Sequence, residues 1–308
     1  MYLKFSDVLK RRLGTRVQKL SVDGGFSCPN RDGAISTGGC TFCDNSSFSP
    51  DYCRTSGGIT SQIKAGMRFF GEKYPDQKYL VYFQSYSSTY ASDDVIRERI
   101  EEALAFPGIS GVVVGTRPDV ISDGILDYFE DLASKYYVEV EYGVESTDDA
   151  VLARVNRGHG YAASVDAVKR TAGRGIVIGA HMIMGLPGES REGMVDGVLK
   201  VAELPVDVLK LHQLQIIRGT AMAAEYQASP QDFNLFTQDS YIDLLLEIIG
   251  RLPERIALER FVNQVPPAFL IAPRWGIKNH EFVAVLEKKM KKMGIKQGKF
   301  YVKKQNKE

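Results

Sequence analysis

All four cysteines of the chain, Cys28, Cys40, Cys43 and Cys53, fall within one stretch of 26 residues, CPNRDGAISTGGCTFCDNSSFSPDYC. Cys40 and Cys43 form a C-x2-C pair, which is a compact pair of ligands for a tetrahedral metal or an iron–sulfur cluster. Cys28 precedes this pair by a spacer of eleven residues, and Cys53 follows it after nine. The stretch therefore predicts a metal or cluster site with three or four thiolate ligands.

Two structural assignments of these thiols compete with a reactive cluster. A disulfide framework is disfavoured because we expect a cytoplasmic location, where thiols stay reduced. A four-cysteine zinc site is the stronger alternative, but such sites usually join two close pairs, and here the outer cysteines stand singly. Gly33, Gly38 and Gly39 let the loop wrap closely around a ligand, and the aromatic Phe42 directly precedes Cys43. These features favour a cluster that takes part in chemistry.

Short β-branched runs and helical stretches alternate along the chain and would position this loop. The predicted strands lie at 16–22, 78–84, 111–115, 138–144, 176–184 and 207–215, with amphipathic stretches between them. This alternation predicts an α/β fold with a parallel sheet, either an open doubly wound sheet or an incomplete barrel. From about Gly219 the pattern indicates helices around one more strand, at 255–262.

Polar loops follow the predicted strands and are expected to meet at one rim. The cysteine loop follows the first strand, QSYSSTY (84–90) the second, TRPD the third, ES the fourth and GLPGE the fifth. In either α/β arrangement ligands gather at the carboxyl ends of the strands. The binding site is therefore predicted among these loops.

Charge is distributed unevenly along a chain of ordinary globular composition. The formal net charge is +1, but residues 287–308 hold nine lysines against two glutamates, which leaves −6 on the preceding part. Such a tail is either a footprint for nucleic acid or a solvated terminus. No apolar run approaches the roughly 20 residues needed to cross a bilayer, so no membrane partner is expected.

The cysteine loop after the first strand, with an aromatic before its last paired cysteine and GLPGE after the fifth strand, resembles the radical S-adenosylmethionine (radical SAM) superfamily. Most members have C-x3-C-x2-C, whereas this chain has C-x11-C-x2-C. The longer spacer, with CPNRDG, GGCTFC and QVPPAFLIAPRWGIKN, is similar to the YhcC-type branch. That branch is related to the radical domain of the Elongator catalytic subunit and to oxygen-independent coproporphyrinogen oxidases.

The resemblance implies a fold and a domain division. It implies a partial (β/α)6 TIM-like barrel with parallel strands over residues 16–220, preceded by an N-terminal extension, 1–15. Residues 221–308 would form a mostly helical C-terminal extension that ends in the basic tail.

The resemblance also implies the cofactors. Cys28, Cys40 and Cys43 would hold a [4Fe–4S] cluster whose fourth iron binds the amino and carboxylate groups of S-adenosylmethionine (SAM). One electron, from a donor such as flavodoxin or ferredoxin, would then release a 5′-deoxyadenosyl radical that abstracts hydrogen from a tRNA base or a small metabolite. Cys53 is left either as a packed residue or as a thiol facing the radical. The alternative from another class is a non-catalytic, zinc-stabilised module that binds RNA.

Several residues match positions that contact SAM in the related enzymes. Phe42 would lie near the adenine, and Gln84, Ser85 and Tyr86 replace a glycine-rich segment that receives the methionine amino group; a simple polar turn is the other interpretation.

Four further residues follow later strands. Thr116 lies where relatives bind the ribose, although Pro118 could make this stretch only a helix-entry turn. Glu145 and Arg157 match a polar residue and an arginine that contact SAM, and an arginine can hold a carboxylate through two hydrogen bonds; a surface ion pair is the alternative. His181 shares a strand face with Ile183 and is either a cofactor contact or a core histidine.

Overall fold

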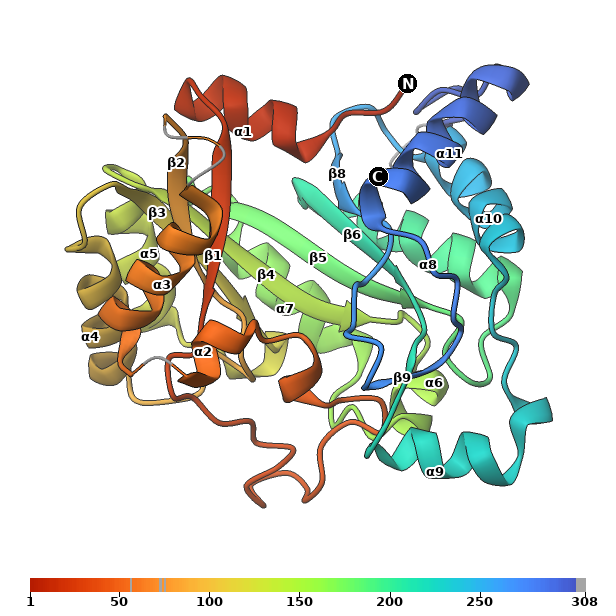
Figure 1. The fold of residues 1–308 in the computed structure, drawn as a ribbon, viewed down its shortest axis with the longest axis horizontal. Helices are drawn as coiled ribbons and strands as arrows, with labels where there is room; N and C mark the ends of the chain where they lie inside the picture. Colours follow the sequence, from red (N-terminus) through yellow and green to blue (C-terminus); the bar gives the residue numbers. More distant parts are fainter. Residues whose placement is uncertain (56, 72–73, 75, 303–308) are drawn as a thin grey trace, which may run out of the picture.

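Seven parallel strands form one curved sheet in this computed structural model, which describes residues 1–55, 57–71, 74 and 76–302 (Figure 1). The spatial order β1-β2-β3-β4-β5-β6-β8 follows the order along the chain. The strands are β1 (Val17–Val22), β2 (Lys78–Phe83), β3 (Ile109–Thr116), β4 (Tyr137–Glu145), β5 (Val177–Met184), β6 (Val208–Gln213) and β8 (Ala257–Arg260). The sheet curls without closing, so the prediction of a partial TIM-like barrel is confirmed.

Helices connect the strands and cover the convex face of the sheet. The longer ones are α3 (Ile59–Gly71), α4 (Asp93–Leu104), α5 (Asp123–Ala133), α7 (Tyr161–Thr171), α8 (Arg191–Glu203), α10 (Gln238–Arg251) and α11 (Asn279–Met293). Short elements at the loops are α2 (Asp51–Thr55), α6 (Asp149–Arg154), α9 (Ala221–Ala228), η1 (Asn45–Ser47), η2 (Pro118–Val120) and η3 (Pro230–Asp232). A ribbon pairs β7 (Ile216–Ile217) with β9 (Leu270–Ala272).

The strands are apolar in nearly every position because both faces of the sheet are covered. In β3, Val112 and Val114 pack beneath the helices, whereas Val113 packs on the concave side. Side-chain oxygens of Ser122 and Ser190 cap the helices α5 and α8 that follow, which fixes where each helix begins.

Helix α1 (Phe5–Leu13) closes the end of the half-barrel where the strands begin, and the cysteine loop lies at the opposite end (Figure 1). Phe5 and Leu9 pack there against Val113 and other concave-face residues. The interior of the half-barrel is thus apolar at the end where the strands begin. Its polar side chains lie in the middle and at the opposite rim.

The strand predicted at 255–262 is observed as β8, and it belongs to the main sheet. Val208 of β6 pairs with Ala257 in parallel register, and the Leu258 amide donates to the carbonyl of Leu3. The chain before α1 thereby covers the outer edge of the last strand. No helix within the described part of the chain has the length and apolar character to cross a membrane.

Candidate functional site

A cavity of about 240 Å³ lies at the carboxyl ends of the strands, as predicted for the loops of this rim. Cys28, Cys40 and Cys43 line it, together with residues from β5, β6 and β8. The three thiols that the sequence singled out therefore face one common space.

The cysteine loop is held in place by main-chain hydrogen bonds to distant segments. The Thr41 amide donates to the carbonyl of Val155 at 3.0 Å, and the Thr41 carbonyl accepts from the amide of Met222 at 2.9 Å. Between the paired cysteines, the Cys43 amide donates to the carbonyl of Cys40 at 2.9 Å. This turn presents both thiols of the C-x2-C pair to the cavity.

The segment NRG (156–158) after α6 contacts the cysteine loop and helps to hold it in place. Asn156 donates through its side chain to the carbonyl of Gly39 at 2.9 Å. Gly158 has a φ of +80°, and a Cβ there would lie 2.6 Å from the side-chain oxygen of Asn30. A glycine is therefore required at this close approach.

Arg157, between these two residues, contacts both the cluster loop and the end of β4. Its Nη1 lies 3.7 Å from Sγ of Cys40, its Nη2 donates to the carbonyl of Gly143 at 2.5 Å, and Glu145 is 3.8 Å away. Its Nε is buried and has no hydrogen-bond partner. On the other side of the loop, Arg31 donates to the carbonyl of Cys43 at 2.5 Å.

Most residues predicted to contact SAM line this same cavity: Phe42, Gln84, Tyr86, Thr116, Glu145, Arg157 and His181. Ser85 is not among the lining residues; it is buried, with its Oγ 3.4 Å from that of Ser49, and Ser87 lines the cavity instead. Their roles toward SAM stay predictions.

Several of these side chains already have protein partners. The Thr116 and Thr89 hydroxyls lie 2.6 Å apart, and the Gln84 side chain accepts from Ser21 at 3.1 Å. Tyr86 has a φ of +59°, and its amide donates to the side chain of Asn45 at 3.0 Å. Phe42 packs against apolar residues beside the loop. The loop and the strand ends are therefore tied together before any ligand binds.

Arg117 and Asp119, in the turn after β3, bind each other. Two guanidinium nitrogens of Arg117 donate to the Asp119 carboxylate at 2.9 and 2.8 Å, and its Nη1 donates to the carbonyl of Arg157 at 2.8 Å. This pair positions the backbone of Arg157.

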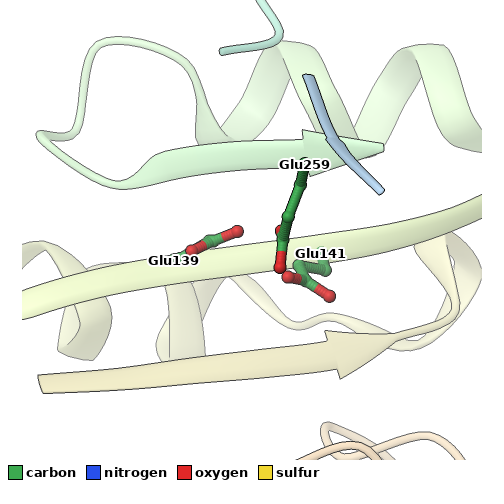
Figure 2. Close-up of side chains that lie close together, drawn as sticks. All are labelled: Glu139, Glu141 and Glu259. Atoms are coloured by element: carbon green, nitrogen blue, oxygen red, sulfur yellow. The ribbon is translucent and has the colours of Figure 1, made fainter. Parts of the chain in front are cut away.

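A buried charge network in the middle of the barrel was not predicted from the sequence. Lys19 Nζ lies 3.2 Å from Glu139, 2.8 Å from Glu141 and 3.0 Å from Glu259, and Lys210 contacts the last two. Figure 2 shows the three carboxylates turned toward one another. Their oxygens lie within 4.8 Å, a spacing suited to a metal ion, but the Lys19 ammonium contacts all three.

The network carries opposite pKa shifts on two carboxylates of one strand. Burial raises the pKa of Glu139 to about 8, whereas Lys19 and Lys210 outweigh burial and hold the pKa of Glu141 well below its ordinary value. Alternating charges in the otherwise apolar VEVEYGV were the available sequence signal.

The top of this network opens into the cavity. Glu141 accepts from the Tyr82 hydroxyl at 2.5 Å and lies 2.8 Å from Nε2 of His181. The rings of His181 and His212 are 5.7 Å apart. His212 and Gln213, adjacent on β6, both line the cavity.

The chain thus forms a parallel half-barrel with a thiol-rich loop after its first strand, and the three thiol-bearing residues line the cavity at its carboxyl rim. The sequence profile of the Radical SAM superfamily matches residues 33–198, and that of the Radical_SAM C-terminal domain matches 206–292. The chain belongs to the radical SAM superfamily.

Relatives of this chain are similar over nearly its whole length. It is 34% identical to the uncharacterized protein YtqA of Bacillus subtilis (95% of this chain, 90% of that protein) and 34% identical to protein YhcC of Escherichia coli K12 (94% and 93%). Among solved structures, Elp3 of the archaeon Methanocaldococcus infernus matches with a TM-score of 0.67 at 16% identity, covering 91% of this chain. This chain spans 64% of that Elp3 chain.

Proposed function

We propose that this protein is a radical SAM enzyme in which Cys28, Cys40 and Cys43 hold a [4Fe–4S] cluster. The observation that carries the proposal is that these three thiols and Arg157 face one cavity at the carboxyl rim of the half-barrel. When bound, the cluster would supply the electron that cleaves SAM and yields a 5′-deoxyadenosyl radical for hydrogen abstraction.

The donor set fits a cluster with one open iron. Cys53 is buried in α2, does not line the cavity, and donates its thiol to the carbonyl of Ser21 at 3.1 Å. A four-cysteine zinc site would require this thiol to join the other three. Three thiolates are the set that leaves a coordination position for SAM.

The unpaired part of Arg157 fits the carboxylate of SAM. Its Nε is buried without a partner, and a charge-assisted hydrogen bond is stronger than a neutral one. Glu145 lies beside this guanidinium and would receive the amino group, with Gln84 and Tyr86, which follow β2, lining the same cavity. Phe42 would cover the adenine, and Thr116 and His181 would border the ribose and the adenine.

The substrate is proposed to be a tRNA base or a small metabolite, and the electron donor a flavodoxin or ferredoxin. The basic residues of α11 support RNA through their charge. They lie toward the end of the barrel where the strands begin, however, whereas the cavity opens at the other end (Figure 1).

The test is anaerobic reconstitution of the full chain with iron and sulfide. We expect a brown protein with about four irons per chain. With a strong reductant it should convert SAM to 5′-deoxyadenosine, measured by chromatography. A colourless protein that binds zinc and leaves SAM intact would instead support the zinc-stabilised RNA-binding module.

A further inference from the structure

Arg260, the last residue of β8, lines the cavity without a partner. Its half-buried guanidinium makes no hydrogen bond or ion pair with the described part of the chain, although its charge helps to lower the pKa of the adjacent Glu259. Its neighbour in the sheet register, Lys210, is by contrast paired with Glu141 and Glu259. A guanidinium inside a cavity costs solvation energy unless it finds an anion or a hydrogen-bond acceptor there.

Other polar atoms on the same wall are also unsatisfied. Nε2 of His212, Oε1 of Gln213 and Oε1 of Gln215 are buried and have no hydrogen-bond partner. Gln213 is only 5% exposed, and all three residues line the cavity. Buried polar groups in native proteins are nearly always paired, so this wall suits a ligand. The two glutamine oxygens accept hydrogen bonds, so the ligand would carry N–H or O–H donors for them in addition to any group that binds Arg260.

The charges of the network below leave Arg260 as the available cation. Lys19 and Lys210 together contact Glu139, Glu141 and Glu259, so both lysines are already neutralised. Burial raises the pKa of Glu139 to about 8, which leaves it largely uncharged at neutral pH. One positive charge is then uncompensated at this end of the cavity.

The histidine beside Arg260 does not add to that charge. Burial, His181 and Arg260 hold the pKa of His212 well below its ordinary value. In the tautomer that carries the proton on Nε2, a neutral imidazole can donate one hydrogen bond to an anion held by the guanidinium.

We propose that the substrate carries an anionic group, a carboxylate or a phosphate, that binds the guanidinium of Arg260, with Gln213 and His212 beside it. The assignment rests on the proposed function, in which Arg157, near Cys40, binds the carboxylate of SAM. Arg260 is then left to bind a group of the substrate. The planar fork of an arginine can hold either anion through two hydrogen bonds. Arg260 would thus determine the substrate class from within the cavity that the three cysteines also line.

The experiment is titration calorimetry of the reconstituted full chain with inorganic phosphate and with acetate, balanced by chloride at constant ionic strength. Each titration is run with and without SAM, so that an anion bound at Arg157 is displaced and recognised. We expect saturable binding of at least one anion that persists with SAM. Phosphate alone indicates a phosphorylated substrate, and acetate alone a carboxylic acid.

Variants locate the site. Arg260→Gln should weaken this binding at least tenfold, and Arg260→Lys, which keeps the charge, should weaken it less. Arg251→Gln is the matched control, since Arg251 is exposed on α10 and pairs with Glu247 at 3.0 Å. It should bind the anion as the wild type does.

Three results would overturn the proposal: no saturable binding of either anion to the wild type, equal binding by Arg260→Gln, or a loss of SAM affinity in Arg260→Gln, which would place Arg260 in the cofactor site. Failure of the proposed function is seen separately, as a wild type that holds no four-iron cluster and does not cleave SAM. If the wild type holds no cluster, the same anion titrations are run on the cluster-free protein. The comparison of wild type with Arg260→Gln then still tests whether Arg260 binds the anion.

Discussion

Nη1 of Arg157 lies 3.7 Å from Sγ of Cys40, although the two residues are 117 positions apart in the chain. Both side chains are buried, and Gly158 next to the arginine allows the close approach of the two loops. A guanidinium at this distance can donate a charge-assisted hydrogen bond to a sulfur ligand of a cluster. The contact joins a predicted cluster ligand to the residue predicted to bind the carboxylate of SAM.

Replacing Arg157 by alanine should weaken SAM binding and leave the cluster in place. Loss of a charge-assisted hydrogen bond costs about 1.5–3 kcal/mol, which is about tenfold to over a hundredfold in affinity. Calorimetry of SAM binding to the reconstituted variant measures the loss, and iron analysis checks the cluster. Arg154→Ala, an exposed arginine paired with Glu225, is the control and should bind normally. Unchanged affinity in Arg157→Ala would remove it from the SAM site.

Alanine substitution of each cysteine should separate three ligands from one packed residue. Cys28→Ala, Cys40→Ala and Cys43→Ala should lose the cluster, because each thiol faces the cavity. Cys53→Ala should keep about four irons and bind SAM, since its thiol only bonds the Ser21 carbonyl. Iron content after anaerobic reconstitution is the measurement. Loss of iron in Cys53→Ala would revive a four-cysteine site.

Glu189 of GLPGE should make stability depend on pH. Burial raises its pKa to about 7, and its Oε1 accepts from Ser146 at 2.6 Å. Because the folded pKa lies above the unfolded one, this contribution to stability is complete below the ordinary carboxyl pKa and is lost as pH rises through about 7. Glu189→Gln cannot ionise, so it should gain stability relative to wild type between about pH 5 and about pH 8. Parallel melting curves across this range would contradict the assignment.

Lys19→Met should strongly destabilise the fold. It leaves Glu139 without a cation and Glu141 and Glu259 to share Lys210. Removing one partner of a buried ion pair lowers the free energy of unfolding by about 3–5 kcal/mol. Chemical denaturation of the variant and the wild type would measure this loss. Lys4→Met, which breaks the more exposed pair with Glu287, should cost about 0–1 kcal/mol.

Adding Glu259→Gln to Lys19→Met should restore part of the lost stability, because Glu141 then has Lys210 to itself. A double variant as unstable as the single one would show that Lys19 acts mainly through its packing.

The role of the basic tail is tested by charge reversal, because the structure makes deletion unsuitable. Gln297 is buried, and its side chain donates to the carbonyls of Pro253 and Ile256 at 2.8 Å, so removing residues 294–308 would disturb β8. Residues 303–308 lie outside the described part of the chain.

Lys291→Glu with Lys292→Glu, both exposed on α11, should weaken tRNA binding and reduce its dependence on salt. Fluorescence anisotropy at several salt concentrations is the measurement. A wild type without salt-dependent binding would identify the tail as a solvated terminus.

The fold was largely predictable because local patterns carry it. The β-branched runs became β1 to β6, and the run at 255–262 became β8. That β8 joins the main sheet depends on pairing with β6 and on the edge cover from Leu3, which are contacts between distant segments. Such contacts leave no periodic signal in the chain.

The site divides in the same way. The thiols and their spacing, the order of strands and helices, and the rim at which the loops meet could be predicted from the chain alone, because these follow from local patterns. Three features needed the three-dimensional arrangement: Cys53 bonds the Ser21 carbonyl and does not line the cavity, Arg157 reaches Cys40, and Arg260 lines the cavity. Packing across the sheet sets the direction and pairing of a side chain, and the partners involved are far apart along the chain.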